Sequence, residues 1–153
     1  MNDPNEIPAA LTKSPGFLLN QAARSIRNLT AIALKPVGLA PQEYGLLRLL
    51  SLEGPMSQQS LANKYQIDRA TVTEIIDVLE RRGLLQREPM ATDRRCKEIH
   101  LTPTGSRVIT RASKSVSRAH HKFLAPLTDE EWTVVQECLM RLITAARAGI
   151  PEE

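Results

Sequence analysis

The chain has 153 residues, of which 42% are hydrophobic and 3% aromatic, and its formal net charge is +3. This hydrophobic fraction supports a folded core, while so few aromatic residues disfavour a stacking platform for single-stranded nucleic acid. No apolar run approaches the roughly 18 residues of a membrane span, and the N-terminus does not resemble a secretory signal. We therefore expect a cytoplasmic protein. Its two cysteines, Cys96 and Cys138, are expected to be free thiols rather than to form a disulfide.

The first third of the chain predicts a short arm followed by two helices. Residues 1–13 are polar and contain prolines, so we expect a flexible arm. Ser14 followed by Pro15 is typical of a helix start, and apolar residues at helical spacing continue to about Ala33. After a break, a second helix begins near Pro41.

The middle of the chain predicts a helix-turn-helix. Ser57 is placed to cap one short helix, and Asp68 to cap the next, which continues through Arg82 and ends at Gly83. Residues 65–67 form a tight link between the two. Two short helices joined by a turn of this length are the helix-turn-helix arrangement.

A β-hairpin is predicted directly after these helices. Residues 84–87 read as one strand, residues 89–95 as a polar turn, and residues 97–101 alternate polar and apolar as a second strand would. A helix-turn-helix followed by a hairpin is a winged helix. The fold class we predict is therefore mainly α with a small β-hairpin wing, the winged helix-turn-helix occupying residues 40–102.

Two more helices complete the predicted fold. Thr102 caps one that runs to about Phe123, and Thr128 caps another that runs to about Ala148, with Glu131 completing a capping box. Each carries an apolar stripe; the stripes comprise Val108, Ile109, Ala112, Val116, Ala119 and Phe123, and Trp132, Val135, Leu139, Leu142 and Ile143.

These stripes can pack within one chain or against a second copy. We favour a homodimer formed by residues 14–35 and 103–149, because two-fold symmetry supplies two recognition helices for a palindromic site.

The helix after Asp68 is the candidate recognition helix. A recognition helix reads bases with its N-terminal residues, so the candidates are Arg69, Thr71, Thr73 and Glu74. Arginine can donate to guanine or phosphate, threonine can offer a hydroxyl to phosphate or a methyl to thymine, and glutamate can accept from cytosine. The alternative is an ordinary amphipathic surface helix, and the acidic residues Glu74 and Asp77 favour that alternative slightly.

Two further groups of residues are candidates for contact with double-stranded DNA. Ser57, Gln58 and Gln59 lie at a helix N-terminus, whose free amides favour phosphate. In the hairpin, Arg94, Arg95 and Lys97 could enter the narrow minor groove. The alternative for the hairpin is a solvated charged loop.

Residues 57–105 resemble the MarR (multiple antibiotic resistance regulator) family of winged-helix repressors. The matching residues are Leu61-Ala62, Asp68 to Thr73, Leu79 to Leu84, Arg87, Asp93-Arg94-Arg95 and Leu101 to Gly105. The resemblance implies that Thr71 and Thr73 lie in the major groove and that Arg95 is the minor-groove arginine. The chain departs from the family at Glu74 and Val78, where a basic residue is frequent.

The resemblance also implies an intertwined homodimer and a site for a small effector, often aromatic or anionic, between the dimer helices and the winged helix. Phe17, Arg24 and Tyr44 are candidates for this site from their positions in the first two helices. Core packing explains the two aromatic residues equally well.

Other sensing chemistries have weaker support. Cys96 lies beside Arg95 and Lys97, which would lower the pKa of its thiol and favour oxidation, but no resolving cysteine is evident. The adjacent residues His120 and His121 point about 100° apart on a helix, so they do not bind one metal ion together. We expect neither a metal nor a cofactor.

The leading hypothesis is a ligand-responsive, homodimeric repressor that binds a palindromic operator. The alternative is a winged helix used as a protein-protein interaction module, which would not need Arg94 and Arg95. Enzyme motifs are missing from the sequence: no Ser/His/Asp order, no glycine-rich phosphate loop and no metal-spaced ligands, so we do not expect an enzyme.

Overall fold

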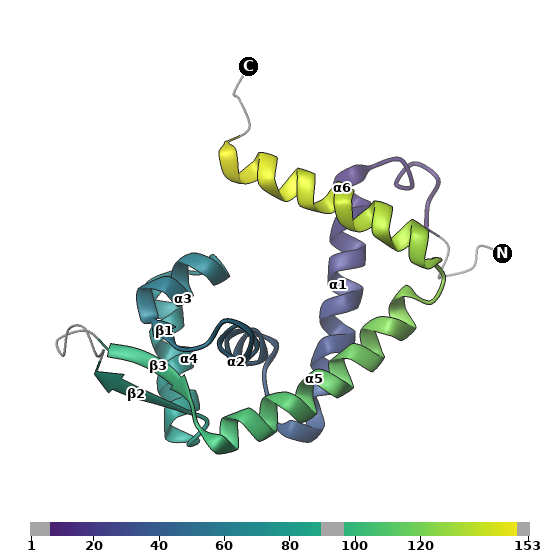
Figure 1. Cartoon of the computed structure of the whole chain (residues 1–153). Helices are drawn as coiled ribbons and strands as arrows, with labels where there is room; N and C mark the ends of the chain where they lie inside the picture. The colour runs from purple at the N-terminus through teal and green to yellow at the C-terminus, as the bar shows by residue number, and fades with distance from the viewer. Residues whose placement is uncertain (1–6, 90–96, 150–153) are drawn as a thin grey trace. The chain divides into compact units, whose positions relative to one another are not determined.

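The computed structural model describes residues 7–89 and 97–149 (Figure 1). In chain order the elements are α1 (Pro15–Leu34), the 3-10 helix η1 (Lys35–Val37), α2 (Pro41–Glu53), β1 (Met56–Ser57), α3 (Gln58–Tyr65), α4 (Arg69–Arg81), β2 (Leu85–Pro89), β3 (Lys97–Leu101), α5 (Pro103–Leu124) and α6 (Asp129–Ala148). The chain divides into two compact units, Met1–Ala119 and His120–Glu153. The first unit contains the predicted winged helix, and this fold class is confirmed.

Side-chain caps begin the helices where the sequence predicts them. The hydroxyl of Ser57 accepts from the Ser60 amide at 3.1 Å, and a carboxylate oxygen of Asp68 accepts from the Thr71 amide at 2.8 Å. Thr102 accepts from the Gly105 amide at 3.0 Å. These bonds satisfy amides that have no partner within the first helical turn. They fix the starts of α3, α4 and α5.

The prediction for the first strand of the hairpin was wrong at both ends. Leu84 lies in the turn that closes α4: its amide donates to the Leu79 carbonyl at 2.9 Å, while Gly83 adopts a positive φ of 68°. This is the Schellman arrangement that ends many helices at a glycine. Pro89, assigned to the turn, is the last residue of β2 and lies opposite Lys97.

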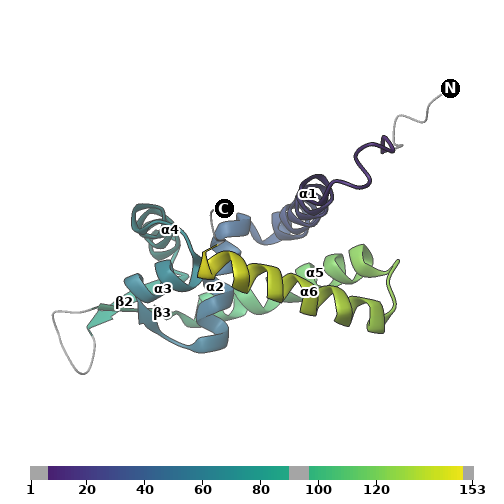
Figure 2. The same ribbon diagram turned by 90° about the horizontal axis from the view of Figure 1, so that it is seen from above.

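The sheet has three antiparallel strands in the order β1-β3-β2. The sequence analysis missed β1, in which Met56 pairs with Ile99. This pairing places Ser57, the cap of α3, beside the hairpin. Figure 2 shows the hairpin extending from the same end of the first unit that carries α3.

The core lies between the helices of the first unit and the sheet. The apolar face of α4 is buried, since none of Val72, Ile75, Ile76 and Leu79 is more than 8% exposed. α2, α3, the hairpin and α5 supply most of the other buried residues, among them Leu46, Leu47, Leu50, Leu61, Leu85, Ile99, Ile109, Ala112 and Val116. One half of the α5 stripe therefore packs within the chain.

Glycine at position 105 allows α5 to begin close against the end of α4. A Cβ atom there would collide with the carbonyl oxygen of Leu84. The hydroxyl of Thr102 also donates to the carbonyl of Gly83 at 2.7 Å. The end of α4 is thus held against the start of α5.

The terminal helices carry apolar residues that the chain leaves in solvent. α6 has no buried residue, and α1 buries only Leu34. The exposed large apolar residues of these helices are Leu18, Leu19, Ile32, Val134, Val135, Met140, Leu142 and Ile143. None of the helices in the described parts of the chain combines the length and apolar character needed to cross a membrane.

Candidate DNA-binding surface

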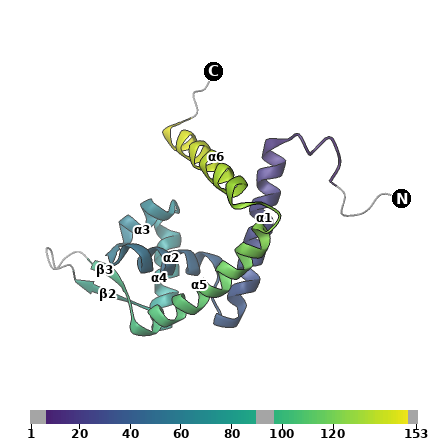
Figure 3. The ribbon, with the colours of Figure 1, turned by 45° about the vertical axis from the view of Figure 1, so that its right-hand side comes forward.

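A concave surface of about 340 Å³ lies where α3, α4 and the hairpin meet, and Figure 3 shows these elements at one end of the first unit. Its lining residues are Ser57, Gln58, Gln59, Arg69, Arg87, Lys97 and Ile99. The sequence analysis predicted DNA contacts for five of them: Ser57, Gln58, Gln59, Arg69 and Lys97. The structure therefore brings together predicted residues that lie up to 40 positions apart in the sequence.

The lining of this surface contains three basic residues and no acidic one. Arg69 and Lys97 are exposed, and among the described residues neither has an ion-pair partner. Unpaired cations in a concavity create a positive potential that attracts polyanions. The surface is therefore electrostatically suited to a phosphate backbone.

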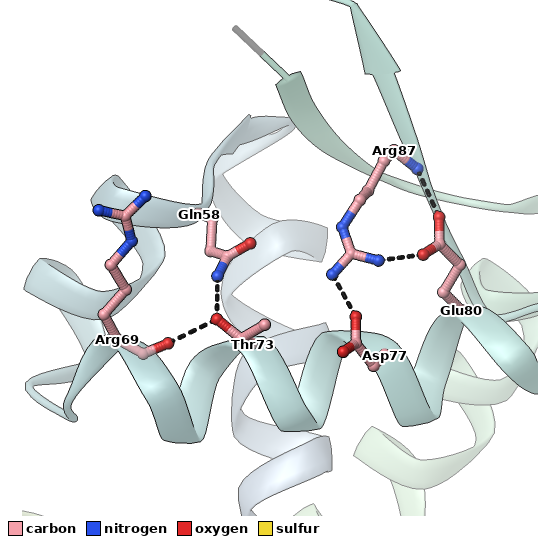
Figure 4. Close-up of polar contacts among 6 residues, drawn as sticks. All are labelled: Gln58, Arg69, Thr73, Asp77, Glu80 and Arg87. Atoms are coloured by element: carbon pink, nitrogen blue, oxygen red, sulfur yellow. Dashed lines mark hydrogen bonds and ion pairs between the residues drawn. The ribbon is translucent and has the colours of Figure 1, made fainter.

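Thr73 joins the two helices of the helix-turn-helix (Figure 4). Its hydroxyl donates to the Arg69 carbonyl at 2.7 Å and accepts a hydrogen bond from the Gln58 amide nitrogen. The hydroxyl proton is therefore already in use within α4, and the methyl group is what Thr73 can offer to a thymine. Gln58, predicted as a phosphate contact, also orients α3 against α4.

Thr71 is committed in a similar way to the start of α4. Its hydroxyl and its amide donate to the two carboxylate oxygens of Asp68, at 2.6 and 2.8 Å. These hydrogen bonds lower the pKa of Asp68 below its ordinary value, because they stabilise the charged carboxylate. The Thr71 hydroxyl would have to leave Asp68 to donate to DNA.

Arg87 is a site residue that the sequence analysis matched to the family without giving it a role. Its guanidinium, on β2, forms ion pairs with Asp77 at 2.5 Å and with Glu80, both on α4 (Figure 4). Its backbone amide also donates to Glu80 at 3.1 Å. Burial opposes the charge of Arg87, but the two carboxylates outweigh it and raise the pKa. Arg87 therefore fixes the hairpin to the recognition helix and neutralises acidic charge on it.

Glu74 keeps the exposed position on α4 that the sequence predicted. Among the described residues it has no ion-pair partner, in contrast to Asp77 and Glu80. Its carboxylate is available to accept from a base edge, so its role in selecting cytosine stays a prediction.

Several predicted residues are not placed at this surface. Arg94, Arg95 and Cys96 lie outside the described residues. Phe17, Arg24 and Tyr44 line neither this surface nor the second cavity described below, and Tyr44 packs against the core. Within residues 7–89 and 97–149, no cluster of three or more His, Cys, Asp or Glu side chains could hold a metal ion.

Comparisons with known proteins identify relatives of this chain. A model of the MarR family matches residues 39–97. A Thauera aromatica protein, named as a transcriptional regulatory protein for the hcr operon, is 33% identical over 105 residues, covering 69% of this chain and 63% of the relative. An uncharacterized HTH-type transcriptional regulator of Bacillus subtilis, YsmB, is 31% identical over 125 residues, 82% of this chain and 81% of its own length. CouR from Rhodococcus jostii RHA1, solved with p-coumaroyl-CoA bound, matches with a TM-score of 0.78 at 30% identity, covering 95% of this chain and 99% of that one.

Proposed function

The chain belongs to the MarR family of transcriptional regulators, and from this premise we propose that it is a ligand-responsive repressor that binds a palindromic operator as a homodimer. The observation that carries the proposal is the positively charged surface formed by α3, α4 and the hairpin. As a DNA-binding regulator it would act in the cytoplasm.

The exposed apolar residues of α1 and α6 support the homodimer. Met140, Leu142 and Ile143 on α6 are each at least 44% exposed in the single chain. Leaving such side chains in water forgoes about 25 cal/mol for each Å² of apolar surface that a partner would cover. A two-fold partner would cover them and place two copies of α4 on one duplex.

Each candidate side chain has a distinct role in DNA binding. Arg69 and Lys97 contact phosphates or guanine, and the free amides at the start of α3 hold a phosphate. Glu74 selects cytosine, and the Thr73 methyl group contacts thymine. Arg95 enters the minor groove from the wing.

The effector we propose is an anionic aromatic compound, delivered as the free acid or as a thioester. The support is CouR, which is 30% identical across 95% of this chain and was solved with p-coumaroyl-CoA. The effector would shift the protein toward a geometry in which the two recognition helices no longer match the spacing of the operator half-sites.

The test is a fluorescence anisotropy titration against duplexes selected from a random pool. Wild type, Arg69→Gln and Arg95→Ala are compared at several salt concentrations, with Arg111→Gln as the matched control, since Arg111 is exposed on α5 away from this surface. We expect a steep salt dependence for wild type, a loss of about ten-fold or more for the first two variants and little change for the control.

A second arm separates this proposal from a protein-interaction module. The wild-type protein is titrated again after unfolding, dialysis and refolding, which removes any bound effector. If it still fails to bind the selected pool at low salt, or if all four proteins bind equally, the DNA-binding proposal is wrong.

A further inference from the structure

A second cavity, of about 540 Å³ and widely open to solvent, lies between α2 and α5 in the first unit. Arg48 lines it from α2, and Ser113, Lys114, Ser117 and Arg118 line it from α5. The four α5 residues fall at helical spacings of one, three and four, which places them along one face. That face of α5 lies next to the buried stripe of the same helix.

The charge of this cavity is not balanced within the chain. Three of its five lining residues are cations and none is acidic. Among the residues that the structure describes, Arg48, Lys114 and Arg118 have no ion-pair partner. α5 contains no acidic residue at all. Three like charges around one cavity repel one another, and an anion bound between them would remove that repulsion.

Ser113 is a second, independent indication of a ligand. Its Oγ is buried and makes no hydrogen bond, alone among the buried side-chain polar atoms of the described residues. A hydroxyl in a helix can bond to the carbonyl four residues earlier, as Thr110 does to Ser106 at 2.8 Å, but Ser113 does not. A buried donor without a partner is costly, and a phosphate oxygen in the cavity would accept from it.

We propose that this cavity binds the phosphate groups of a small phosphorylated ligand. Two or more negative charges are needed to offset Arg48, Lys114 and Arg118, and a monocarboxylate supplies only one. Arginine forms paired hydrogen bonds to phosphate oxygens, and the hydroxyls of Ser113 and Ser117 add uncharged donors.

The location of the cavity connects it with DNA binding. It shares α2 with the core that supports α3 and α4. This inference rests on the proposed function only where it makes the bound ligand an effector; binding itself is measured separately.

The experiment is isothermal titration calorimetry of the full chain with pyrophosphate at fixed ionic strength, with benzoate as the monovalent probe. The variants are Arg48→Gln/Arg118→Gln and Ser113→Ala, and the matched control is Arg141→Gln, at an exposed position of α6 that does not line the cavity. We expect wild type to bind pyrophosphate more tightly than benzoate. Relative to wild type, the double variant should bind pyrophosphate at least about ten-fold more weakly, and Ser113→Ala about three- to ten-fold more weakly. The control should be unchanged, and melting temperatures establish that each variant is folded.

The same variants are titrated with selected duplex DNA. If pyrophosphate does not bind wild type, or if Arg141→Gln weakens pyrophosphate binding as much as the double variant does, the proposal is wrong. If the double variant loses DNA affinity but not pyrophosphate affinity, the cavity contacts the DNA backbone and the proposal is also wrong. A wild type that binds pyrophosphate but no duplex contradicts the proposed function while supporting this site.

Discussion

α4 and α6 are both amphipathic helices, but they use their apolar residues differently. On α4, the apolar face is at most 8% exposed, whereas on α6 the residues Met140, Leu142 and Ile143 are at least 44% exposed. The apolar face of α4 is covered by α2, α3 and the sheet of the same chain. The comparison teaches that the first unit itself covers the apolar face of α4, whereas the apolar residues of α6 are left exposed and would be covered in the proposed homodimer.

The largest effect is expected in the core below α4. Ile76→Ala removes a fully buried side chain and should lower the free energy of unfolding by about 2 to 5 kcal/mol, measured by urea denaturation. Val78→Ala, at a half-buried position of the same helix, is the control and should cost clearly less. If both substitutions lowered the free energy of unfolding equally, the difference in burial between the two faces of α4 would be contradicted.

The next effect tests the other half of the comparison. Leu142→Glu places a charge among the exposed apolar residues of α6 and should raise the dimer dissociation constant at least about 30-fold, as expected for a central interface residue. Sedimentation equilibrium measures the constant, and Gln136→Glu on the same helix is the control. An unchanged dissociation constant would mean that the dimer interface lies elsewhere. A monomeric wild type would contradict the proposed dimer.

A smaller effect is expected where the hairpin meets α4. Arg87→Gln leaves the carboxylates of Asp77 and Glu80 unpaired on the recognition helix, where they repel phosphate. We expect about a ten-fold loss of DNA affinity and a cost in unfolding free energy of about 1 to 2 kcal/mol. The control is Arg81→Gln, which removes a cation from α4 that forms no ion pair with Asp77 or Glu80. If the two variants behave alike in the titration, Arg87 acts only through its charge.

The smallest effect concerns the start of α4. The pKa of Asp68 is lowered in the folded state, so its carboxylate stabilises the fold above the ordinary value near 3.8, and this contribution is lost as the pH falls through the lower, folded pKa. The urea midpoint should therefore exceed that of Asp68→Asn at pH 7, and the difference should shrink below about pH 4. Using the Leu142→Glu background keeps dimer dissociation out of the measurement, and a difference independent of pH would contradict the prediction.

Local signals made most of the fold predictable. Capping residues such as Ser57, Asp68 and Thr128 act on amides two or three positions away, so the sequence alone locates the helix starts. β3 was predicted correctly because its polar and apolar residues alternate. β1 was missed because two residues cannot show a pattern, and its strand character comes from pairing with a segment about 40 positions later.

The site was less predictable for the same reason. Ser57, Gln58, Arg69 and Lys97 could be named from their places in the motif, but the ion pairs of Arg87 depend on how β2 folds back against α4. The cavity between Arg48 and α5 likewise joins residues more than 60 positions apart. The basic residues of α5 are visible in the sequence, but the sequence does not show that Arg48 of α2 lies beside them.

The most direct test of the account is the number of protomers on one duplex. Mass photometry is performed on the selected duplex, on a duplex with a single half-site, and on the Leu142→Glu variant with each. Two protomers on the full site, with weak binding of the single half-site and of the variant, is the result expected if α4 reads DNA while α6 pairs the subunits. One protomer bound equally well to both duplexes, unaffected by Leu142→Glu, would contradict it.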